Sequence, residues 1–589
     1  MRKTEICSRR FTKNFSLGRT LIKKSFILNF SLIKNTFSDL NSILNNKLSP
    51  LSPVFKFSTI QHDDLLKVIN RVKSKAKGYD GLSSDHLLLV VSAISGFLLK
   101  LFNKSLSLGE FPEPWKKTLI FALSKSNSLM SISDTRPIAH LCAVSKYLER
   151  LVHQQLTTFI YQNNILSERQ AGYRPGYNTQ SVLLELTEDI KWGIENQMVI
   201  VLLLFDLSKA FDTVPHARLL RKLRSLNFDD TSIKWFHSYL AGRTQSVIDN
   251  QGGHSHWKKT TSGVPQGSVL GPYLFLLYMN DLPTVIKHSK ILMFVDDTQL
   301  YIQCHPSHLK SCIDKLTQDA NSFAAWVNSN GLSINLVKTK AIILGENSLV
   351  SSIDFNTCPK IAIDNCFIEY VTSVKNLGVM FDSTLSWKNH VSKIVSRCYS
   401  TLFSLKIHRH SLSIDLRTKL VQTLIFPHFD YACVVYHFLS KEQNNRLVLA
   451  FNSCIRFIFR IPKYSHITSY RKQLNWLTVD NRRLYFVANL MYYILNNKSP
   501  TFLANRFIYS KDVSLESTDD ISTLRRSLRN PDQETLYVQV CSSVTFYHSF
   551  SIGGARFWNS IPTSITKKRR LSINTFKTEI YNYLMSLPS

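Results

Sequence analysis

The chain has 589 residues, of which 44% are hydrophobic, and this composition excludes wholesale disorder and favours about two to four folded domains. It carries 72 lysines and arginines against 41 aspartates and glutamates, which gives a net charge of +31 at pH 7. Such an excess repels cationic partners and attracts a polyanion, so nucleic acid is the first partner to consider.

The spacing of the cysteines and the hydropathy of the chain indicate the kind of cellular compartment in which the protein occurs. The ten cysteines show neither a CxxC pair nor the spacing of a zinc site, which favours a reducing environment. The longest uncharged apolar stretch, 86–99, is shorter than the ~20 residues needed to cross a bilayer, and we expect it to form a buried helix. The N-terminus lacks an apolar core followed by a small-residue cleavage site. The sequence therefore predicts a protein that is neither secreted nor inserted in a membrane.

Residues 1–60 are strongly basic. They contain eleven lysines and arginines against Glu5 and Asp39, and they end in the turn-forming segment LSPLSP at 48–53. We interpret this segment as a basic leader. A solvated arm with no specific role is the open alternative.

From residue 61 onward the pattern is that of a mixed α/β fold. Apolar residues from Val182 to Ile194 recur at i+4 spacing behind a capping residue at Asn178 or Thr179, which predicts a helix. Three apolar runs predict buried strands: 198–205, 291–295 and 341–344. We therefore expect a sheet core between about 195 and 380.

Acidic residues follow two of these predicted strands. Asp206 comes directly after the first strand, and Asp296 and Asp297 stand between the second strand and a further strand-like run, which predicts a hairpin with an acidic tip. Adjacent carboxylates repel each other, so a cation would stabilise them. Together the three acids could hold two divalent ions about 3.5–4 Å apart. A capping role for Asp206 and an ordinary surface turn for the acidic pair are the alternatives.

A glycine-rich segment lies between the two acidic sites. In SGVPQGSVLGP at 262–272, Gly263 and Gly267 allow close approach of the backbone, as would be needed beneath a base pair, and an apolar helix is expected to start near Tyr273. An ordinary loop leading into a helix is the alternative.

Residues 388–483 are helical in pattern and basic, with sixteen lysines and arginines against four acids. Within them, RFIFRIPKY at 456–464 interleaves cations with aromatic residues, a composition suited to phosphate contact and base stacking. The alternative is that Phe457 and Phe459 belong to the core of an amphipathic helix.

The order of these motifs resembles that of the reverse transcriptases of non-LTR (LINE-type) retrotransposons, with jockey-like elements nearest in pattern. The blocks that carry the resemblance are GYDGL at 78–82, FPEPWKKTLI at 111–120, RPIAHL at 136–141, QAGYRPGYNT at 170–179, FDLSKAFDTV at 205–214, SGVPQGSVLGPYLF at 262–275, FVDD at 294–297, GLSINLVKTK at 331–340, VKNLGVMFD at 374–382 and GGARFWNSIP at 553–562. They span roughly residues 61–562.

The resemblance implies an α/β right-hand polymerase. Fingers and palm would occupy 61–385, a basic helical thumb 386–483 and a helical C-terminal region 484–589, behind the leader at 1–60. No endonuclease segment is recognised before the polymerase blocks. Ala122–Lys125 lacks the proline that usually opens the finger strand, and Pro175 stands where the family commonly has a basic residue.

The resemblance also implies a metal site. Asp206 and Asp296 would be the metal ligands, helped by the backbone carbonyl of Leu207, with Asp297 as a supporting acid. Lys338 would protonate the departing pyrophosphate as a general acid, and a merely solvated Lys338 is the alternative.

Five further residues would bind substrate. Phe211 matches the aromatic residue that blocks a ribose 2′-hydroxyl in the family. Arg174 and Lys125 would contact the incoming triphosphate, and Gln266 and Gly267 would lie along the nascent base pair.

The implied function is RNA-templated DNA synthesis by an RNA-directed DNA polymerase that uses two Mg²⁺ ions, which Mn²⁺ can replace. Its partners would be an RNA template, a DNA primer or target and deoxynucleoside triphosphates, with no membrane, in a ribonucleoprotein of the nucleus and cytoplasm. The main alternative is an inactive or domesticated relic that binds nucleic acid without chemistry. A group II intron or retron polymerase is a weaker alternative, because GGARFWNSIP argues against it.

Overall fold

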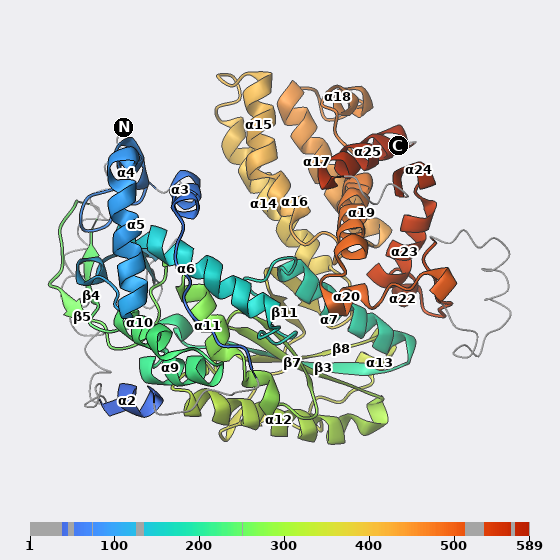
Figure 1. Cartoon of the computed structure of the whole chain (residues 1–589). Coiled ribbons are helices and arrows are strands. Elements are labelled where there is room, and N and C mark those ends of the chain that lie inside the picture. Colours follow the sequence, from blue (N-terminus) through green and yellow to red (C-terminus); the bar gives the residue numbers. More distant parts are fainter. Residues whose placement is uncertain are drawn as a thin grey trace. The chain divides into compact units, whose positions relative to one another are not determined.

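The computed structural model describes residues 38–44, 52–72, 75–124, 135–249, 251–512, 535–566 and 572–587. Most of the predicted leader, and Lys125, lie outside the described residues. Figure 1 shows the helices and strands of the chain. The chain divides into two compact units. Unit 1 comprises Met1–Ser167, Lys209–Asn280 and Ser329–Leu332, and unit 2 comprises Glu168–Ser208, Asp281–Asn328 and Ser333–Ser589.

Unit 1 combines helices with a four-stranded sheet in the order β2-β1-β4-β5. Its elements are α2 (Ser38–Leu44), α3 (His62–Arg71), α4 (Ser84–Leu89), α5 (Val91–Leu108), β1 (Lys117–Ser124), β2 (Thr135–His140), α6 (Ala143–Gln162), α8 (Ala210–Thr213), α9 (His216–Ser225), α10 (Asp230–Leu240), β4 (Thr244–Ile248), β5 (Lys258–Lys259) and α11 (Gly271–Met279).

The apolar stretch 86–99 forms the end of α4 and the first half of α5, with a break at Val90. Leu87 and Leu98 are buried, whereas the side chains of Leu89 and Phe97 are 85% and 68% exposed. The prediction of a helix is confirmed and the prediction of full burial is wrong, because the apolar residues lie on more than one side of the helix and only one side packs inward. No helix within the described ranges is long and apolar enough to span a bilayer.

Unit 2 is built around a four-stranded sheet in the order β6-β7-β3-β8. Its elements are α7 (Thr179–Glu195), β3 (Val199–Phe205), β6 (Lys290–Phe294), β7 (Asp297–Cys304), α12 (Leu309–Ser329), β8 (Lys340–Leu344), α13 (Asn347–Ser351), β9 (Ala362–Ile363), β10 (Cys366–Phe367), β11 (Ser373–Asn376), β12 (Val379–Asp382), α14 (Lys388–Lys406), α15 (Ile414–Leu424), α16 (Phe426–Asp430), α17 (Lys441–Phe459), α18 (Thr468–Gln473), α19 (Val479–Asn497), α20 (Thr501–Ala504), α22 (Val544–Tyr547), α23 (Phe550–Ser560), α24 (Thr563–Thr566) and α25 (Ile573–Ser586).

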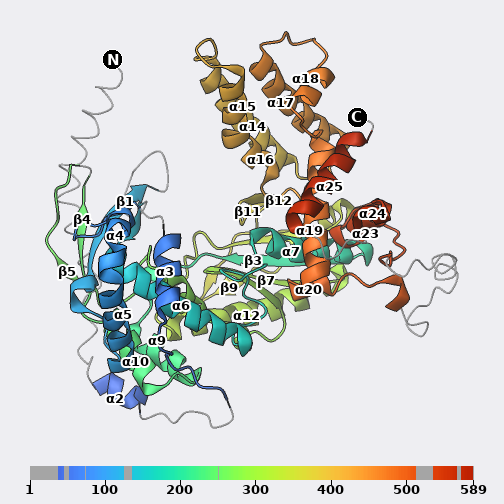
Figure 2. The same cartoon turned by 45° about the horizontal axis from the view of Figure 1, so that its top comes forward.

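Strand β3 is an inner strand of this sheet, antiparallel to both β7 and β8. In Figures 1 and 2, α7 and α12 lie on opposite faces of the sheet, so β3 is covered on both sides. Ile200 and Leu202 pack in one core cluster with the apolar side of α7, and Phe205 contacts Phe323 of α12 with ring centroids 4.0 Å apart. Burial on both faces explains why this strand is apolar at every position.

The predicted elements of the sheet are confirmed with small shifts of their ends. All three predicted strands are present, and β6 and β7 form the predicted hairpin. Helix α7 begins after Asn178, whose side chain accepts a hydrogen bond from the backbone N–H of Ser181 and receives the reciprocal bond that completes a capping box.

From Lys388 onward unit 2 is helical, as predicted, and the helices α14 to α19 gather beside one another in Figure 2. Phe457 on α17 is 4% exposed, and the half-buried Phe459 packs against Tyr470 with ring centroids 4.8 Å apart. The core alternative for these two aromatic residues is therefore confirmed. The described part of the chain is thus mixed α/β followed by helices.

Candidate active site

Asp206 leaves the end of β3 at a position fixed by strand register. Phe205, the last residue of β3, pairs with Thr298 of β7. Because the two strands are antiparallel, the same register sets Asp206 opposite Asp297. The predicted proximity of these two acids is thereby explained by ordinary strand pairing.

On the other side of β3, Leu204 pairs with Lys340 of β8. The strand pairing does not continue past Lys340, because 336–338 form a turn and Asp206 O accepts instead from Asn335 N. This turn places the Nζ atom of Lys338 3.9 Å from Oδ2 of Asp206. Both side chains are partly exposed, so the contact is a loose ion pair that solvent screens. The structure therefore brings Asp297 and Lys338 to Asp206, which precedes them in the sequence by 91 and 132 positions.

Asp296 occupies the tip of the β6–β7 hairpin. Phe294 pairs with Asp297, which leaves Val295 and Asp296 as a two-residue turn. Val295 has a φ of +63°, a conformation that is rare for a β-branched residue and persists only when its surroundings hold it.

The surroundings that hold this turn come from the segment 169–172. The Gln170 side chain is fully buried; its Oε1 accepts from Val295 N at 3.0 Å and from Gly172 N at 2.9 Å, and its Nε2 donates to Val295 O at 3.2 Å. A Cβ atom on Gly172 would lie 2.5 Å from Cγ2 of Val295, so this position requires glycine. Nothing in the pattern of QAGYR identifies Gln170 as the residue that holds the acidic turn, and the sequence prediction missed it.

The acids perturb one another. Partial burial of the turn, together with the negative charges of Asp296 and Asp206, raises the pKa of the Asp297 carboxyl to about 6. The pKa of the Tyr173 hydroxyl is also raised, by burial and by the charge of Asp296. A bound cation would relieve this repulsion.

The carboxylates of this site suit Mg²⁺ that is bound partly by substrate, rather than a metal ion whose ligands all come from protein side chains. Within the described ranges, no three His, Cys, Asp or Glu side chains are placed so that they could hold one ion. Mg²⁺ is commonly bound by one or two carboxylates together with substrate phosphates and water. Asp206 and Asp296 can supply those carboxylates.

Leu207 could add a backbone oxygen. Asn335 N donates to Asp206 O at 2.7 Å, and Ser208 N donates to Ser333 O at 2.8 Å. These two bonds flank Leu207 in an antiparallel bridge and use neither its N–H nor its carbonyl.

Arg174 lies in the same segment as Gln170. Its Nη1 donates to Gln170 O at 3.2 Å, and its guanidinium lies 4.4 Å from the ring centroid of Tyr177. The side chain is half-buried, and it belongs to the segment that holds the acidic turn through Gln170.

Unit 1 contains the glycine-rich loop. Gly267 has a φ of +114°, and a Cβ there would lie 2.7 Å from the carbonyl of Ala139, whose own N–H donates to Gln266 O at 2.6 Å. Nε2 of Gln266 donates to Oδ1 of Asp212 at 2.8 Å. The loop is thus joined both to β2 and to the helical turn that follows Asp206 in the chain, and the glycine requirement at 267 is steric.

Phe211 is also in unit 1. Its ring stacks on Phe275 of α11, with centroids 4.4 Å apart and planes 17° apart, and its carbonyl accepts from Val264 N at 2.8 Å. The ring is half-buried, so it is supported from one side. Glu149, a fully buried acid that the sequence prediction missed, accepts from Val269 N at 2.8 Å and so fixes the end of the loop.

A second buried amide pair was not predicted. Nδ2 of Asn376, at the end of β11, donates to Oε1 of Gln299 in β7 at 2.7 Å, and the two side chains are 2% and 1% exposed. This pair connects the β11–β12 hairpin, which resembles the primer grip of the family, to the hairpin that carries the acids.

Comparison with known proteins supports the same chemistry. Residues 123–381 match the family described as reverse transcriptase (RNA-dependent DNA polymerase). The chain is 25% identical over 420 residues to the probable RNA-directed DNA polymerase from transposon X-element of Drosophila melanogaster, covering 70% of this chain and 45% of that protein. It is 25% identical over 438 residues to the RNA-directed DNA polymerase from mobile element jockey of the same species, covering 72% and 46%.

A third relative, the probable RNA-directed DNA polymerase from transposon BS of Drosophila melanogaster, is 26% identical over 451 residues, covering 74% of this chain and 48% of that protein. The chain spans less than half the length of each of these relatives. The similarities confirm the predicted resemblance to the RNA-directed DNA polymerases of jockey-like non-LTR retrotransposons.

Proposed function

We propose that this chain catalyses RNA-templated DNA synthesis, in which a primer 3′-hydroxyl attacks the α-phosphate of a deoxynucleoside triphosphate. The observation that carries the proposal is the strand register that sets Asp206 opposite Asp297, with Asp296 at the adjoining turn and Lys338 3.9 Å from Asp206, inside a region that matches the reverse transcriptase family.

Asp206 and Asp296 would hold the metal ions, and the Leu207 carbonyl would add a ligand. Two Mg²⁺ ions, when bound, lower the pKa of the attacking hydroxyl and stabilise the charge of the departing pyrophosphate, and Mn²⁺ can replace them. Asp297 adds negative charge beside these ligands and so strengthens the attraction for cations.

The remaining site residues act on substrate. Lys338 would donate a proton to the leaving pyrophosphate, and Arg174 would contact the triphosphate through charge-assisted hydrogen bonds. Phe211 would exclude a ribose 2′-hydroxyl, while Gln266 and Gly267 would border the nascent base pair. Contacts within each unit support these roles by fixing the side chains: Arg174 donates to Gln170 in unit 2. In unit 1, Gln266 donates to Asp212 and Phe211 stacks on Phe275.

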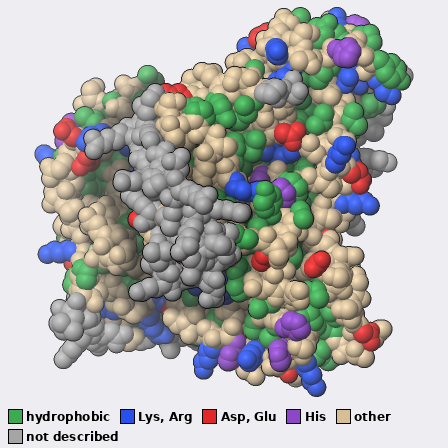
Figure 3. Space-filling view, turned by 90° about the vertical axis from the view of Figure 1, so that its right-hand side faces the viewer, with side chains coloured by type: hydrophobic (Ala, Val, Ile, Leu, Met, Phe, Trp, Pro, Cys, Tyr) green, Lys and Arg blue, Asp and Glu red, His purple; other side chains and the backbone are tan. Residues whose placement is uncertain are grey.

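We assign residues 61–385 to the fingers and palm of a right-hand polymerase, 386–483 to a basic thumb and 484–589 to a C-terminal region. On the face shown in Figure 3, lysine and arginine side chains are dispersed over the surface. Dispersed cations and a net charge of +31 suit contact with many backbone phosphates, so template and primer binding should weaken steeply with salt.

A primer-extension assay tests the proposal. The purified chain is incubated with oligo(dT) annealed to poly(rA), deoxythymidine triphosphate and Mg²⁺, and extension that disappears with EDTA is expected. Binding of the primer–template without any extension in Mg²⁺ or Mn²⁺ would instead favour the inactive, nucleic-acid-binding relic.

A further inference from the structure

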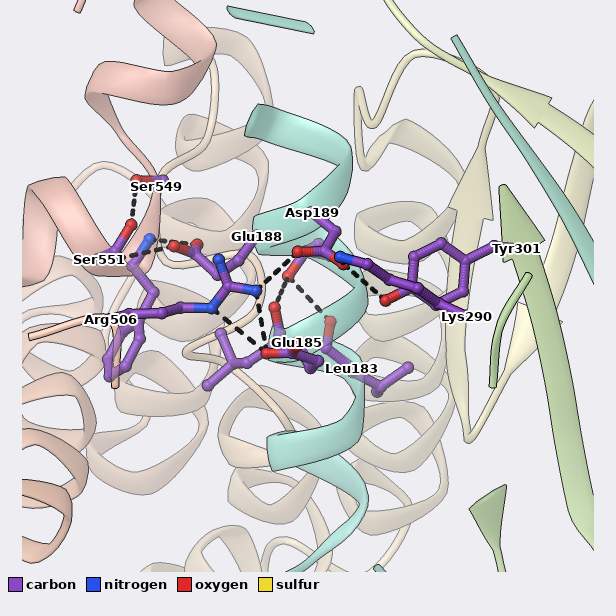
Figure 4. Close-up of polar contacts among 12 residues, drawn as sticks. Leu183, Glu185, Glu188, Asp189, Lys290, Tyr301, Arg506, Ser549 and Ser551 are labelled. Atoms are coloured by element: carbon purple, nitrogen blue, oxygen red, sulfur yellow. Dashed lines mark hydrogen bonds and ion pairs between the residues drawn. The ribbon is translucent and has the colours of Figure 1, made fainter. Parts of the chain in front are cut away.

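Helix α7 presents carboxylates to the C-terminal part of unit 2. Figure 4 shows Glu185, Glu188 and Asp189 on this helix. The three residues are 6%, 1% and 5% exposed. Burying ionised carboxylates is costly unless each finds a cation or several N–H donors. The ion-pair and hydrogen-bond partners of these acids therefore identify the segments that α7 contacts.

Arg506 neutralises two of the acids. Its Nη2 lies 3.0 Å from Oε2 of Glu185 and 2.7 Å from Oδ1 of Asp189. Burial raises the pKa of Glu185, whereas the charges of Glu185, Glu188 and Asp189 raise the pKa of Arg506 well above its usual range despite its burial. The guanidinium is therefore the permanent counterion of this side of the helix.

Two further carboxylates of α7 cap C-terminal helices. Glu188 accepts from Phe550 N at 2.6 Å and from Ser551 N at 2.8 Å, at the start of α23. Glu195 accepts from Ser542 N at 2.6 Å and from Ser543 N at 2.8 Å, ahead of α22. Negative charge at a helix N-terminus is stabilising because free N–H groups and the helix dipole point toward it. Ion pairs and hydrogen bonds thus attach the residues around 506 and 542–551 to α7.

Asp189 connects this attachment to the hairpin of the candidate active site. Its Oδ2 accepts from Lys290 Nζ, at the first residue of β6, and from Tyr301 Oη, in β7, both at 2.7 Å. Its backbone carbonyl accepts from Nε2 of Gln303 in β7 at 2.6 Å. One carboxylate is therefore shared between Arg506 and both strands that lead to Asp296 and Asp297 (Figure 4).

We propose that Arg506 is a positioning residue for the polymerase reaction: by fixing the Asp189 carboxylate, it fixes the β6–β7 hairpin that carries Asp296 and Asp297. The inference rests on the proposed function. It makes the segment that contains α20, α22 and α23 a part of the catalytic scaffold, in addition to any contact it makes with nucleic acid.

The alternative is that Arg506 only stabilises the fold. Arg506→Gln alone does not separate the two, because it leaves Glu185 and Asp189 buried without their guanidinium and destabilises the protein in either case. The double variant E185Q/R506Q removes one buried acid together with the cation. Asp189 then keeps Lys290 as its counterion but loses the donor on Oδ1. Lys577→Gln on α25 is the matched control, since it also removes one cation from the C-terminal region.

The primary measurement is hydrogen–deuterium exchange in peptides covering 290–304. In E185Q/R506Q, at an unfolding temperature close to that of the wild type, exchange in these peptides should accelerate about tenfold or more, while peptides of α14 and α17 stay unchanged. The kcat for primer extension should fall by about tenfold or more with the primer–template Kd unchanged. Wild-type exchange and kcat in this variant would overturn the proposal.

Two safeguards keep the result decisive. If the double variant unfolds well below the wild type, R506K takes its place, because lysine keeps the charge but lacks the planar guanidinium whose Nε and Nη2 donate to Glu185 and Asp189. Unchanged exchange in 290–304 would then overturn the proposal. The exchange measurement also needs no activity. Failure of the wild type to extend a primer would reject the polymerase function, whereas the exchange result tests the positioning role separately.

Discussion

The amide of Gln170 is hydrogen-bonded to both polar backbone groups of Val295. Val295 is held with a φ of +63° and directly precedes Asp296, so the direction of that acid depends on a side chain that is buried beneath the turn. Left-handed conformations of β-branched residues cost about 1–3 kcal/mol and are maintained by their surroundings. Gln170 is the surrounding group that pairs with both sides of this residue.

Gln170→Leu should therefore lower activity without removing any acid. The leucine has a similar size but leaves Val295 N and O unpaired, and we expect the turn to relax and kcat to fall about tenfold to a hundredfold. Steady-state extension and primer–template binding measure the two effects, and Kd should stay within the wild-type range. Gln318→Leu, at an exposed position of α12, is the control; equal losses in both variants would contradict a role for Gln170 in the turn.

Asp206→Asn and Asp296→Asn should each abolish primer extension while leaving primer–template affinity nearly unchanged. In the proposed assignment the acids hold cations and the basic helices hold phosphates, so the two measurements separate. Asp314→Asn, on an exposed position of α12, should behave as the wild type. Undiminished extension by either of the first two variants would reject the assignment of the metal ligands.

Phe211→Ala should admit ribonucleotides. The ring stacks on Phe275 and is only half-buried, so part of its surface can meet a sugar. Removing it should change the ratio of deoxynucleotide to ribonucleotide incorporation more than tenfold, a difference of about 1.4 kcal/mol or more. Phe211→Tyr keeps the ring and should keep the selection. A ratio that does not move in the alanine variant would leave Phe211 with a packing role only.

We expect a measurable coupling energy between Gln299 and Asn376, because their buried amides are hydrogen-bonded to each other. Gln299→Leu or Asn376→Leu leaves one buried amide without its partner and should cost about 1–3 kcal/mol. The double variant removes both amides and should cost less than the sum of the two single changes. Local unfolding of β7 and β11, followed by hydrogen exchange, measures the three values; strict additivity would show that the bond contributes nothing.

His216 predicts a pH dependence of stability in unit 1. Burial lowers its pKa to about 4, and its ring Nε2 lies 2.8 Å from Gly263 O. The folded ring stays neutral while the unfolded chain takes up a proton near the ordinary histidine pKa of about 6.5, so stability is lost as pH falls from about 6.5 toward 4.

The loss due to this group reaches about 2 kcal/mol near pH 5. His216→Gln keeps a donor toward Gly263 but does not titrate. Its unfolding temperature should therefore drop less than that of the wild type between about pH 7.5 and about pH 5. Identical pH profiles of the two proteins would contradict the assignment.

The sequence predicted the sheet and its acids because both leave local signals. A strand covered on both faces is apolar at every residue, as at 199–205, and an acid directly behind it, such as Asp206, is conspicuous. Strand register then explains why Asp206 and Asp297 meet, and the turn ahead of β8 brings Lys338 beside Asp206.

The remaining features depend on contacts between distant segments. Gln170 and Val295 are 125 residues apart, and a buried glutamine has the same local pattern as a solvated one. Glu185 and Asp189 likewise look like the solvated side of an amphipathic helix, since the arginine that neutralises them is far away in the chain. The prediction for 86–99 was wrong in the opposite sense: it expected burial, but apolar residues such as Leu89 and Phe97 are exposed.

The attachment of Arg506 to α7 also has a consequence for synthesis on the ribosome. Glu185 and Arg506 are 321 residues apart, and at about 5–20 residues per second roughly 15–65 s separate their translation. During this interval the nascent helix carries acids that it cannot yet bury, so α7 cannot complete its packing before Arg506 has left the ribosome. Ribosome-bound chains that end before residue 506 should therefore be degraded by protease within 179–195, and protection should arise only once the C-terminal segment has emerged.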